Sequence, residues 1–295
     1  MPAPARLMGT SLIAVDWGTT NRRVFAIADG HVAATERDDR GATAVQDFAA
    51  EVAAIRARFG GAPMLLAGMV GSNVGWRAVP YVPAPAGLDT LAAALETVAP
   101  GVAIVPGVSF RDGGRADVMR GEEVQLLGAA AAGLVPADAL LCQPGTHCKW
   151  ATLAAGRIVR FTTAMTGELF ALLRGHGLLA RQLGGAVSDG PAFRAGVAEG
   201  ARRDLAASLF GIRAAGLLGL RDEAHAAAHA SGLLIGADVA ARLAEAADAT
   251  VHILADPALG ALYAAAVETL GGAARVIDSQ AAFVAGITRI QELAA

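Results

Sequence analysis

Two short segments carry the residue types that bind phosphate groups. The first is Asp16-Trp17-Gly18-Thr19-Thr20-Asn21, and the second is Pro144-Gly145-Thr146-His147-Cys148-Lys149; each follows a short apolar run. Glycine lets the backbone approach a ligand closely, and threonine hydroxyls add donors beside backbone N–H groups. A turn of this composition at the end of a strand suits the terminal phosphates of a nucleotide, and two such turns can grip a phosphate chain from opposite sides.

Both turns therefore supply candidate ligands for a nucleotide, and the first also supplies candidate catalytic groups. Asp16 stands at the end of the apolar run, where its carboxylate is placed to hold Mg²⁺ through water. Arg23 is a candidate contact to a transferring phosphoryl group. An ordinary hairpin whose threonines favour strands is the alternative for either turn alone. The expected nucleotide ligands are Gly18, Thr19, Thr20, Asn21, Gly145, Thr146, His147 and Lys149.

A third candidate is the pair Glu122-Glu123, which opens a helix-like segment that Pro136 must close. A carboxylate at a binding cleft can accept the proton of a reacting hydroxyl, so either glutamate is a candidate general base. The alternative is structural, because acidic residues in the first turn of a helix stabilise its dipole by about 0.3–1 kcal/mol.

The loop Gly68–Trp76 combines hydrogen-bonding groups with an apolar face, which suits a polyhydroxy acid. A flexible surface loop with a core tryptophan is the alternative. A carboxylate on the ligand needs a cationic or N–H partner, for which Arg120, Lys149 and the Thr166-Gly167 turn remain open. The expected substrate residues are Gly71, Ser72, Asn73, Trp76, Arg120, Glu123, Thr166 and Glu168.

The elements that position these residues can be predicted from the pattern of apolar residues. Three short runs separated by turns predict an opening β-meander, with a tight turn at Asp29-Gly30. A capping-box pattern at Thr43 and Gln46 then predicts the start of an amphipathic helix. The predicted strands are Leu12–Val15, Arg23–Ile27, His31–Thr35, Met64–Ala67 and Val102–Val105.

A second unit repeats the strand-turn-strand theme after Pro136. It should begin with a strand at Ala139–Cys142, and Asp256-Pro257 predicts the start of a late helix. We therefore expect an N-terminal lobe at residues 1–136 with the first phosphate turn. A C-terminal lobe at residues 137–295 should hold the second phosphate turn, with a cleft between the two.

Composition excludes several other classes of protein. The chain has 295 residues, a formal charge of -3 and 54% hydrophobic residues, with no basic run that could follow a nucleic-acid backbone. Its 2 cysteines cannot form a disulfide framework. No apolar run is long enough to span a membrane, and no secretion signal opens the sequence. We expect a cytoplasmic protein that binds neither nucleic acid nor membrane; its oligomeric state cannot be predicted from sequence.

These motifs resemble those of a known superfamily, which contains actin, the heat-shock chaperone ATPases and the sugar kinases. More closely, the chain resembles the 2-dehydro-3-deoxygalactonokinase family. The resemblance implies an α/β fold of two ribonuclease H-like lobes with a nucleotide cleft between them. It also implies that the N-terminal lobe holds the sugar-acid site and the C-terminal lobe the adenosine site. Besides the two turns, it rests on Ala67–Trp76, Met119–Glu123, Met165–Leu169 and Ser231–Gly236.

The resemblance implies a kinase that uses ATP and Mg²⁺ to phosphorylate 2-dehydro-3-deoxy-D-galactonate at its 6-hydroxyl, in galactonate breakdown. It also favours Glu122 over Glu123 as the base, with Asp16 as the fallback, because related kinases carry an acidic residue in the corresponding place. A kinase for another 2-keto-3-deoxy sugar acid, such as the gluconate epimer, and a non-kinase ATPase are the alternatives. The stretch Ala255-Asp256-Pro257 departs from the glycine-rich turn of related kinases, which leaves adenine recognition open.

Overall fold

The computed structural model describes residues 11–246 and 248–295, which form two compact units. Unit 1 comprises residues up to Ala137 together with Leu153–Arg160 and Ser279–Ala295. Unit 2 comprises Asp138–Thr152 and Phe161–Asp278. The first junction falls next to the boundary expected at residue 136, but two later segments group with unit 1. The residues on which the expectation of no secretion signal rests lie outside the described range.

Unit 1 is built on a six-stranded sheet with the order β3-β2-β1-β4-β7-β6. Strand β1 pairs antiparallel with β2 and parallel with β4, so that Asp16 lies opposite both Arg23 and Ala67. The predicted meander is confirmed, and its tight turn uses positive φ angles at Asp29 and Gly30. The strands are β1 (Leu12–Trp17), β2 (Arg22–Ala28), β3 (His31–Asp38), β4 (Met64–Gly68), β6 (Glu96–Ala99) and β7 (Val102–Ile104).

Helix α1 (Phe48–Phe59) covers one face of this sheet. It begins later than the capping-box pattern indicated, because the side chain of Asp47, rather than that of Thr43, accepts the N–H of Ala50 at 2.9 Å. Thr43 belongs instead to a short 3₁₀ turn, η1 (Ala42–Ala44). The predicted amphipathic helix therefore exists, but its predicted start was wrong.

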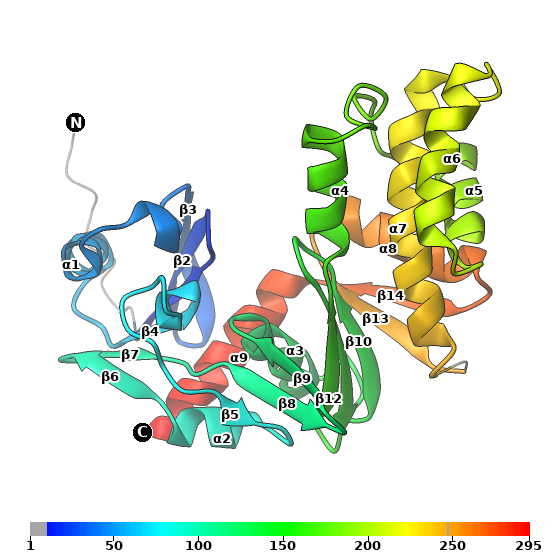
Figure 1. Cartoon of the computed structure of the whole chain (residues 1–295). Helices are drawn as coiled ribbons and strands as arrows, with labels where there is room; N and C mark the ends of the chain where they lie inside the picture. Colours follow the sequence, from blue (N-terminus) through cyan, green and yellow to red (C-terminus); the bar gives the residue numbers. More distant parts are fainter. Residues whose placement is uncertain (1–10, 247) are drawn as a thin grey trace. The chain divides into compact units, whose positions relative to one another are not determined.

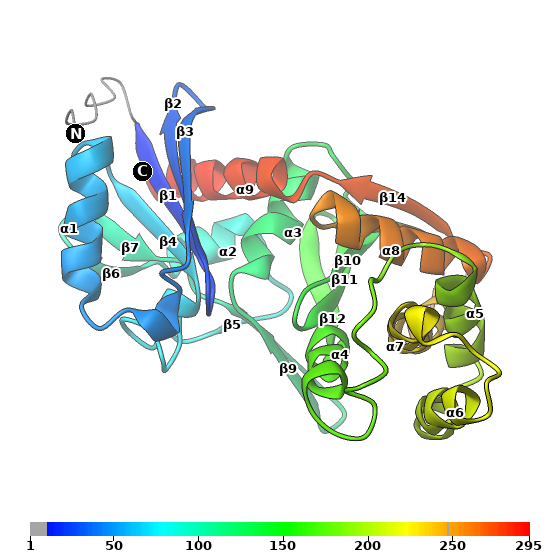
Figure 2. The ribbon, with the colours of Figure 1, turned by 90° about the horizontal axis from the view of Figure 1, so that it is seen from above.

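Two further helices, α3 (Glu122–Ala131) and α9 (Ser279–Ala294), pack closely together in unit 1. Figure 2 shows α9 on the side of the sheet opposite to α1, and the rings of Phe25 and Phe283 meet there at 5.4 Å. A Cβ on Gly128 would lie 2.1 Å from the carbonyl oxygen of Ala282, so only glycine allows this helix contact. The C-terminal helix therefore completes the fold of unit 1.

Several elements of unit 1 were not predicted from the sequence. A three-stranded sheet with the order β5-β8-β9 leads into α3, and α2 packs against α9. These strands are short and partly exposed, so their apolar pattern is weak. The elements are β5 (Val82–Pro83), α2 (Leu88–Ala93), η2 (Met69–Gly71), β8 (Val108–Asp112) and β9 (Arg115–Met119).

Unit 2 contains a five-stranded sheet with the order β12-β11-β10-β13-β14. Strands β10, β13 and β14 run parallel, and β11 and β12 follow β10 through short turns (Figure 1). The predicted recurrence of the strand-turn-strand theme is thus confirmed. The strands are β10 (Ala139–Gln143), β11 (Cys148–Ala154), β12 (Arg157–Ala164), β13 (Thr250–Leu254) and β14 (Ala273–Ile277).

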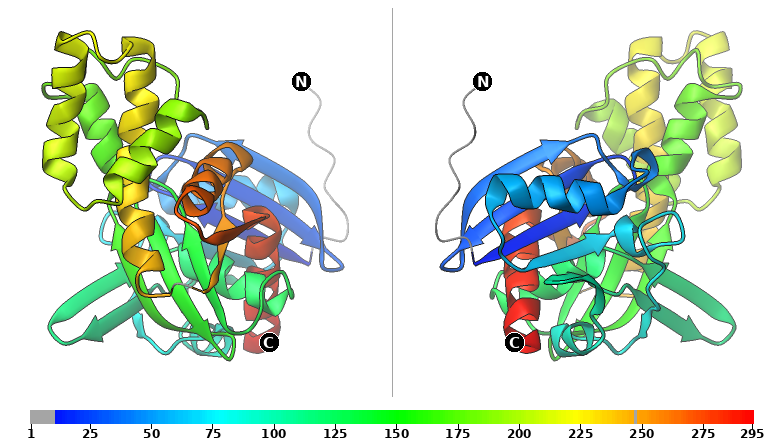
Figure 3. Two further views of the ribbon diagram at one scale, coloured as in Figure 1. Left: turned by 90° about the vertical axis from the view of Figure 1, so that its right-hand side faces the viewer. Right: turned by 90° about the vertical axis from the view of Figure 1, so that its left-hand side faces the viewer.

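Helices form the rest of unit 2, and α5, α6 and α7 stand beside one another (Figure 3). The glycines of Ser231–Gly236 allow α7 to pack tightly against α5, since a Cβ on Gly232 would lie 2.1 Å from the carbonyl oxygen of Phe193. No helix in the described ranges is long and apolar enough to cross a membrane. The helices are α4 (Thr166–Gly175), α5 (Pro191–Gly200), α6 (Leu205–Leu217), η3 (Glu223–His225), α7 (Ala226–Leu243) and α8 (Pro257–Thr269).

Candidate active site

The first phosphate turn lies between β1 and β2 and exposes Thr19, Thr20 and Asn21. The N–H of Gly18 donates to the carbonyl oxygen of Asn21 at 2.9 Å, which closes the turn. The hydroxyl of Thr43 donates to the carbonyl oxygen of Thr19, also at 2.9 Å. The exposed hydroxyl and amide groups are therefore carried on a turn that is fixed from both sides.

Asp16 lies at the end of β1, on the sheet face that does not belong to the α1 core. The alternate residues Val15 and Trp17 are buried in that core, and cross-strand neighbours such as Arg23 share the face of Asp16. Burial of the carboxylate raises the pKa of Asp16 to about 6; the charge of Arg23 lowers it, and the charge of Glu122 raises it. A carboxylate of this kind can bind a cation or exchange a proton near neutral pH.

Glu122 acts electrostatically on Asp16 because two glycines allow very close backbone packing. Gly121 caps α3 with a φ of 109°, and a Cβ on it would lie 3.0 Å from the Cα of Gly68. Gly68, with a φ of 94°, in turn packs on the carbonyl oxygen of Trp17. The start of α3 is thus brought to the end of β1, which explains the electrostatic interaction between the two carboxylates.

The two adjacent glutamates have different surroundings. Glu122 is half-buried, and its carboxylate accepts the N–H of Arg120 at 3.0 Å. Glu123 is fully buried, and both of its carboxylate oxygens accept the N–H of Gly121, at 2.7 and 2.8 Å. Burial, followed by the charge of Glu122, raises the pKa of Glu123 to about 8. Glu122 is thus the more accessible of the two, while Glu123 holds the glycine turn.

The loop expected to bind substrate lies next to these residues in unit 1. Ser72 is buried and donates its hydroxyl to the carbonyl oxygen of Met69 at 2.7 Å, whereas Asn73 is exposed. Trp76 is half-buried, and its ring stacks on Phe48 at 6.4 Å. Ser72 and Trp76 thus support the loop, which leaves Asn73 as its most accessible polar side chain.

Arg120 projects toward the same loop. A Cβ on Gly71 would lie 2.9 Å from its Nη1 atom, so the guanidinium packs directly against the loop backbone. Its Nη2 donates to the carbonyl oxygen of Val79 at 2.6 Å, and its guanidinium stacks over Tyr81 at 4.3 Å. Its buried Nε and Nη1 atoms have no hydrogen-bond partner among the described residues. A planar cation with unused donors is suited to a carboxylate.

The second phosphate turn lies between β10 and β11, and Gly145, Thr146 and His147 are exposed. It is joined to the start of α4, where the N–H of Glu168 donates to the carbonyl oxygen of Thr146 at 2.9 Å. The side chains of His147 and Glu168 meet at 2.5 Å. A Cβ on Gly167 would lie 2.3 Å from the carbonyl oxygen of Gly145, so glycine is required for this contact.

The expected substrate residues therefore fall into two groups. Thr166 and Glu168 lie beside the second turn in unit 2, whereas the other six lie in unit 1. Lys149 is buried on β11 and donates to the hydroxyl of Thr163 at 2.8 Å. The positive charge of Lys149 therefore lies buried behind the turn and is not exposed on its surface.

Asp238 is a half-buried carboxylate that the sequence did not single out. It accepts hydrogen bonds from Trp150 Nε1 at 3.0 Å and from the hydroxyl of Thr166 at 3.2 Å, and it thus joins α7 to β11 and α4. Burial raises the pKa of Asp238, against the effect of these donors. A lone aspartate inside a helical pattern carries no sequence signal of such a role.

A small pocket of about 80 Å³ adjoins the second turn in unit 2. Its walls come from the turn itself, α4, α7 and α8, and they are mostly apolar. The segment Ala255-Asp256-Pro257, which departs from the glycine-rich turn of related kinases, leads into α8. Helix α8 contributes two of the wall residues, Leu259 and Tyr263. The lining residues are Gly145, Thr166, Gly167, Phe170, Ser231, Leu234, Ile235, Leu259 and Tyr263.

The fold and these two turns define the class of the protein. The chain aligns over 96% of its length, with a TM-score of 0.51 and 12% identity, with the activator of 2-hydroxyisocaproyl-CoA dehydratase from Clostridium difficile with bound ADPNP, and it covers 95% of that protein. This likeness concerns the fold alone. It agrees with the strand order of both sheets, and the protein has the α/β fold of the actin-like ATPases and sugar kinases.

Within that class, the chain belongs to the 2-keto-3-deoxy-galactonokinase family, whose model matches residues 16–290. It is 36% identical to the 2-dehydro-3-deoxygalactonokinase of Escherichia coli K12, covering 96% of this chain and 98% of that one. A solved structure of a Sinorhizobium meliloti protein assigned as a 2-dehydro-3-deoxygalactonokinase aligns with a TM-score of 0.88 and 34% identity, covering 95% and 96% of the two chains. The resemblance noted in the motifs is thus confirmed, and the protein is a phosphotransferase.

Proposed function

We propose that this protein transfers the terminal phosphoryl group of ATP to the 6-hydroxyl of 2-dehydro-3-deoxy-D-galactonate. The observation that carries the proposal is the family match over residues 16–290, together with the near-complete coverage of the Escherichia coli relative. A kinase for the gluconate epimer remains the alternative, because the loop residues do not distinguish epimers. A non-kinase ATPase is disfavoured by the same family match.

Asp16 fits a Mg²⁺ site, because Mg²⁺ is usually held by one or two carboxylates together with substrate phosphates. Its carboxylate stands at a strand end next to exposed threonine hydroxyls, and its pKa of about 6 keeps it mostly ionised at neutral pH. When bound, the metal would neutralise negative charge on the transferring phosphoryl group. Arg23, on the same face, adds a second positive charge that can attract that group.

Glu122 is the proposed acceptor of the proton from the substrate hydroxyl. It lies at the start of a helix, is half-buried, and interacts electrostatically with Asp16. The buried Glu123 is less suited, because its pKa of about 8 keeps it largely protonated at neutral pH and its oxygens are engaged by Gly121. Asp16 is the second candidate for the base.

Arg120 is the proposed partner of the substrate carboxylate. Its unused Nε and Nη1 atoms lie beside the backbone of Gly71, within the loop that also carries the exposed Asn73. Since both nitrogens are covered, the loop or the side chain must shift when the sugar acid binds. Glu123, Ser72 and Trp76 then act as supports of the substrate loop and of the turn that precedes α3.

Unit 2 is proposed to hold the rest of the nucleotide. The turn at Gly145–His147 offers backbone N–H groups and a hydroxyl to phosphates, and Lys149 adds positive charge behind it. The adjoining small pocket presents an apolar surface against which one face of an adenine ring can lie, with Leu259 and Tyr263 of α8 in its wall. This arrangement needs no glycine-rich turn at Ala255–Pro257. The cytoplasmic location expected from sequence stays a prediction.

The test is ADP release by the purified protein with MgATP alone, with 2-dehydro-3-deoxy-D-galactonate, and with the gluconate epimer. We expect release that depends strongly on the galactonate and is much slower with the epimer. Equal rates with both sugar acids would support the broader specificity. Release without any sugar acid would overturn the kinase assignment in favour of an ATPase.

A further inference from the structure

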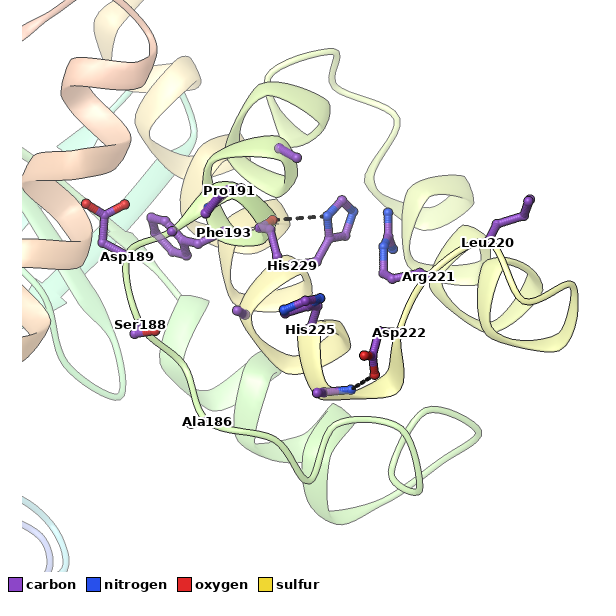
Figure 4. Close-up of a pocket in the computed structure, with 15 residues that line it drawn as sticks. Ala186, Ser188, Asp189, Pro191, Phe193, Leu220, Arg221, Asp222, His225 and His229 are labelled. Atoms are coloured by element: carbon purple, nitrogen blue, oxygen red, sulfur yellow. Dashed lines mark hydrogen bonds between the residues drawn. The ribbon is translucent and has the colours of Figure 1, made fainter.

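A second and larger pocket lies among the helices of unit 2 (Figure 4). Its volume is about 740 Å³, within the range of roughly 300–1,000 Å³ that is typical of small-molecule sites. One wall is the segment Ala186–Ala195, which includes the first turn of α5, and the other is the segment Leu220–His229, which leads into α7. None of its residues belongs to the proposed kinase site.

Basic side chains gather on one side of this pocket. Arg221, His225 and His229 come together from the segment before α7 and from its first turn (Figure 4). Arg221 makes no hydrogen bond or ion pair with any residue that the structure describes. The first turn of α5 forms the opposite wall, and N–H groups in such a turn have no acceptor within the helix.

The acidic side chains that line the pocket are already engaged. Both carboxylate oxygens of Asp189 accept hydrogen bonds from Arg194, at 2.8 and 2.7 Å. Phe193 lies between Asp189 and the two histidines (Figure 4). Asp222 accepts the N–H of Ala224 at 2.9 Å. Neither carboxylate is therefore directed to neutralise Arg221.

His229 is surrounded by charges of both signs, from Arg221 and from Glu199. Its Nδ1 faces the carbonyl oxygen of Ala192 at 3.2 Å and its Nε2 faces a carboxylate oxygen of Glu199 at 3.1 Å, so two acceptors are present for two possible N–H donors. Burial, followed by the charge of Arg221, nevertheless lowers the pKa of His229, although the charge of Glu199 and these two contacts raise it. Burial also lowers the pKa of Arg221, and the charge of Glu199 offsets this.

We propose that this pocket binds a small anionic molecule, a carboxylate or a phosphate monoester with a few apolar carbons. Arg221 and His225 face the anionic group, since a guanidinium with no protein partner is the strongest donor in the pocket. Phe193, Pro191 and Leu220 supply apolar walls for the carbon part. The site is separate from the kinase site, and its occupation does not depend on the identity of the sugar acid.

The proposal has a consequence for proton binding. The charged and titratable groups around His229 are Glu199 on α5, Arg221 before η3 and His225 at the end of η3. An anion beside Arg221 offsets the positive charge that disfavours protonated His229. His229 can then carry two protons and donate to both Ala192 and Glu199, so anion binding takes up a proton at this residue.

The test is to titrate the full-length protein with inorganic phosphate and, separately, with malonate, while observing the ring nitrogen signals of its 6 histidines by NMR. Saturating MgADP is present throughout to occupy the phosphate turns. The signals are assigned with His225→Gln and His229→Gln. We expect saturable shifts at His225 and His229, with His229 moving toward its protonated form, and the anion that saturates first identifies the preferred chemistry.

Arg221→Gln should weaken the preferred anion by about tenfold or more, because it removes the charge-assisted contact. Arg181→Gln is the matched control, since Arg181 is exposed in the same unit and does not line the pocket, and it should leave affinity unchanged. If Arg221→Gln fails to fold, the anion affinity of His225→Gln provides the same comparison. Absence of shifts with both anions, or equal affinity in Arg221→Gln and the parent protein, would overturn the proposal.

Discussion

The two Gly-Thr turns follow equivalent strands in sheets of similar order, yet their side chains differ in charge. Two residues before the glycine, the first turn has Asp16 and the second has Gln143. In unit 1 the carboxylate shares a sheet face with Arg23 and meets the start of α3, which brings Glu122. The first turn therefore combines hydroxyl and amide groups that suit a phosphate with nearby titratable carboxyl groups.

The carboxylate of Asp238, near the second turn, has a different position and a different structural role. Asp238 comes from α7, is half-buried like Asp16, and accepts hydrogen bonds from Trp150 and Thr166. It supports the turn through these two hydrogen bonds, whereas Asp16 stands at the end of the strand that leads into the first turn. Similar backbones thus allow different roles: we infer that the first turn carries chemistry and that the second holds the nucleotide.

The largest difference should appear when Asp16 and Gln143 are changed in parallel. Asp16→Asn removes the charge proposed to hold Mg²⁺, and we expect kcat to fall by about a thousandfold, as when a group that stabilises transition-state charge is lost. Gln143→Ala should lower kcat by less than about tenfold, because it removes no charge from a reacting group. Steady-state ADP release with saturating sugar acid measures both. Comparable losses in the two variants would remove the proposed division of roles.

The next comparison is within unit 1, between two adjacent glutamates. Glu122→Gln should lower kcat by about a hundredfold or more, with little change in the KM for ATP, because it removes the proposed proton acceptor. Glu123→Gln should change kcat by less than about threefold, because Glu123 is mostly protonated at neutral pH and a neutral isostere preserves an acceptor for Gly121. If Glu122→Gln turns over normally, Asp16 becomes the remaining candidate for the base.

Sequence patterns predicted the local parts of this site better than its assembly. Both meanders, both turns and the start of α3 follow from apolar runs bounded by Gly, Pro and Asp, since these signals are local. The packing of Gly121 on Gly68 joins residues 53 positions apart, and no local pattern encodes it. For the same reason the sequence missed Asp238 and did not separate the buried Glu123 from the half-buried Glu122.

Arg120 offers a comparison between recognition of the sugar acid and recognition of ATP. Arg120→Lys keeps the charge but loses the planar fork and the stacking on Tyr81, so the KM for the sugar acid should rise by about tenfold to a hundredfold. The KM for ATP should stay the same. Arg77→Lys is the control, since Arg77 is an exposed arginine paired with Glu96. A parallel rise in both KM values would argue against a specific contact to the substrate carboxylate.

The second turn can be displaced by a single methyl group. In Gly167→Ala the added Cβ would lie 2.3 Å from the carbonyl oxygen of Gly145, so the turn must shift, and we expect the KM for ATP to rise by about tenfold. Gly175→Ala, in the same helix, meets no atom within 4 Å and should leave the KM unchanged. Isothermal titration with a non-hydrolysable ATP analogue checks the effect on affinity. Equal affinity in the two variants would indicate that the turn does not contact the nucleotide.

The smallest effect concerns stability rather than turnover. The pKa of Asp16 is raised from 3.8 to about 6, and that of Glu123 from 4.5 to about 8. Across these windows the folded protein retains protons that the unfolded chain has lost, so the stability contributed by each group is greatest below its unfolded pKa and falls as pH rises through its window. These two groups should by themselves lower the thermal midpoint of the parent protein by roughly 5 °C between about pH 4 and about pH 8.

Variants at the two positions separate their contributions to this decrease. Asp16→Asn should flatten the profile below about pH 6, and Glu123→Gln should flatten it up to about pH 8, since an amide does not titrate in these ranges. Thermal melts followed by circular dichroism at several pH values measure the profiles. A decrease that persists in both variants would assign it to other groups. Flattening by Glu123→Gln without loss of turnover would establish that the buried glutamate acts on the fold and that catalysis belongs to its neighbours.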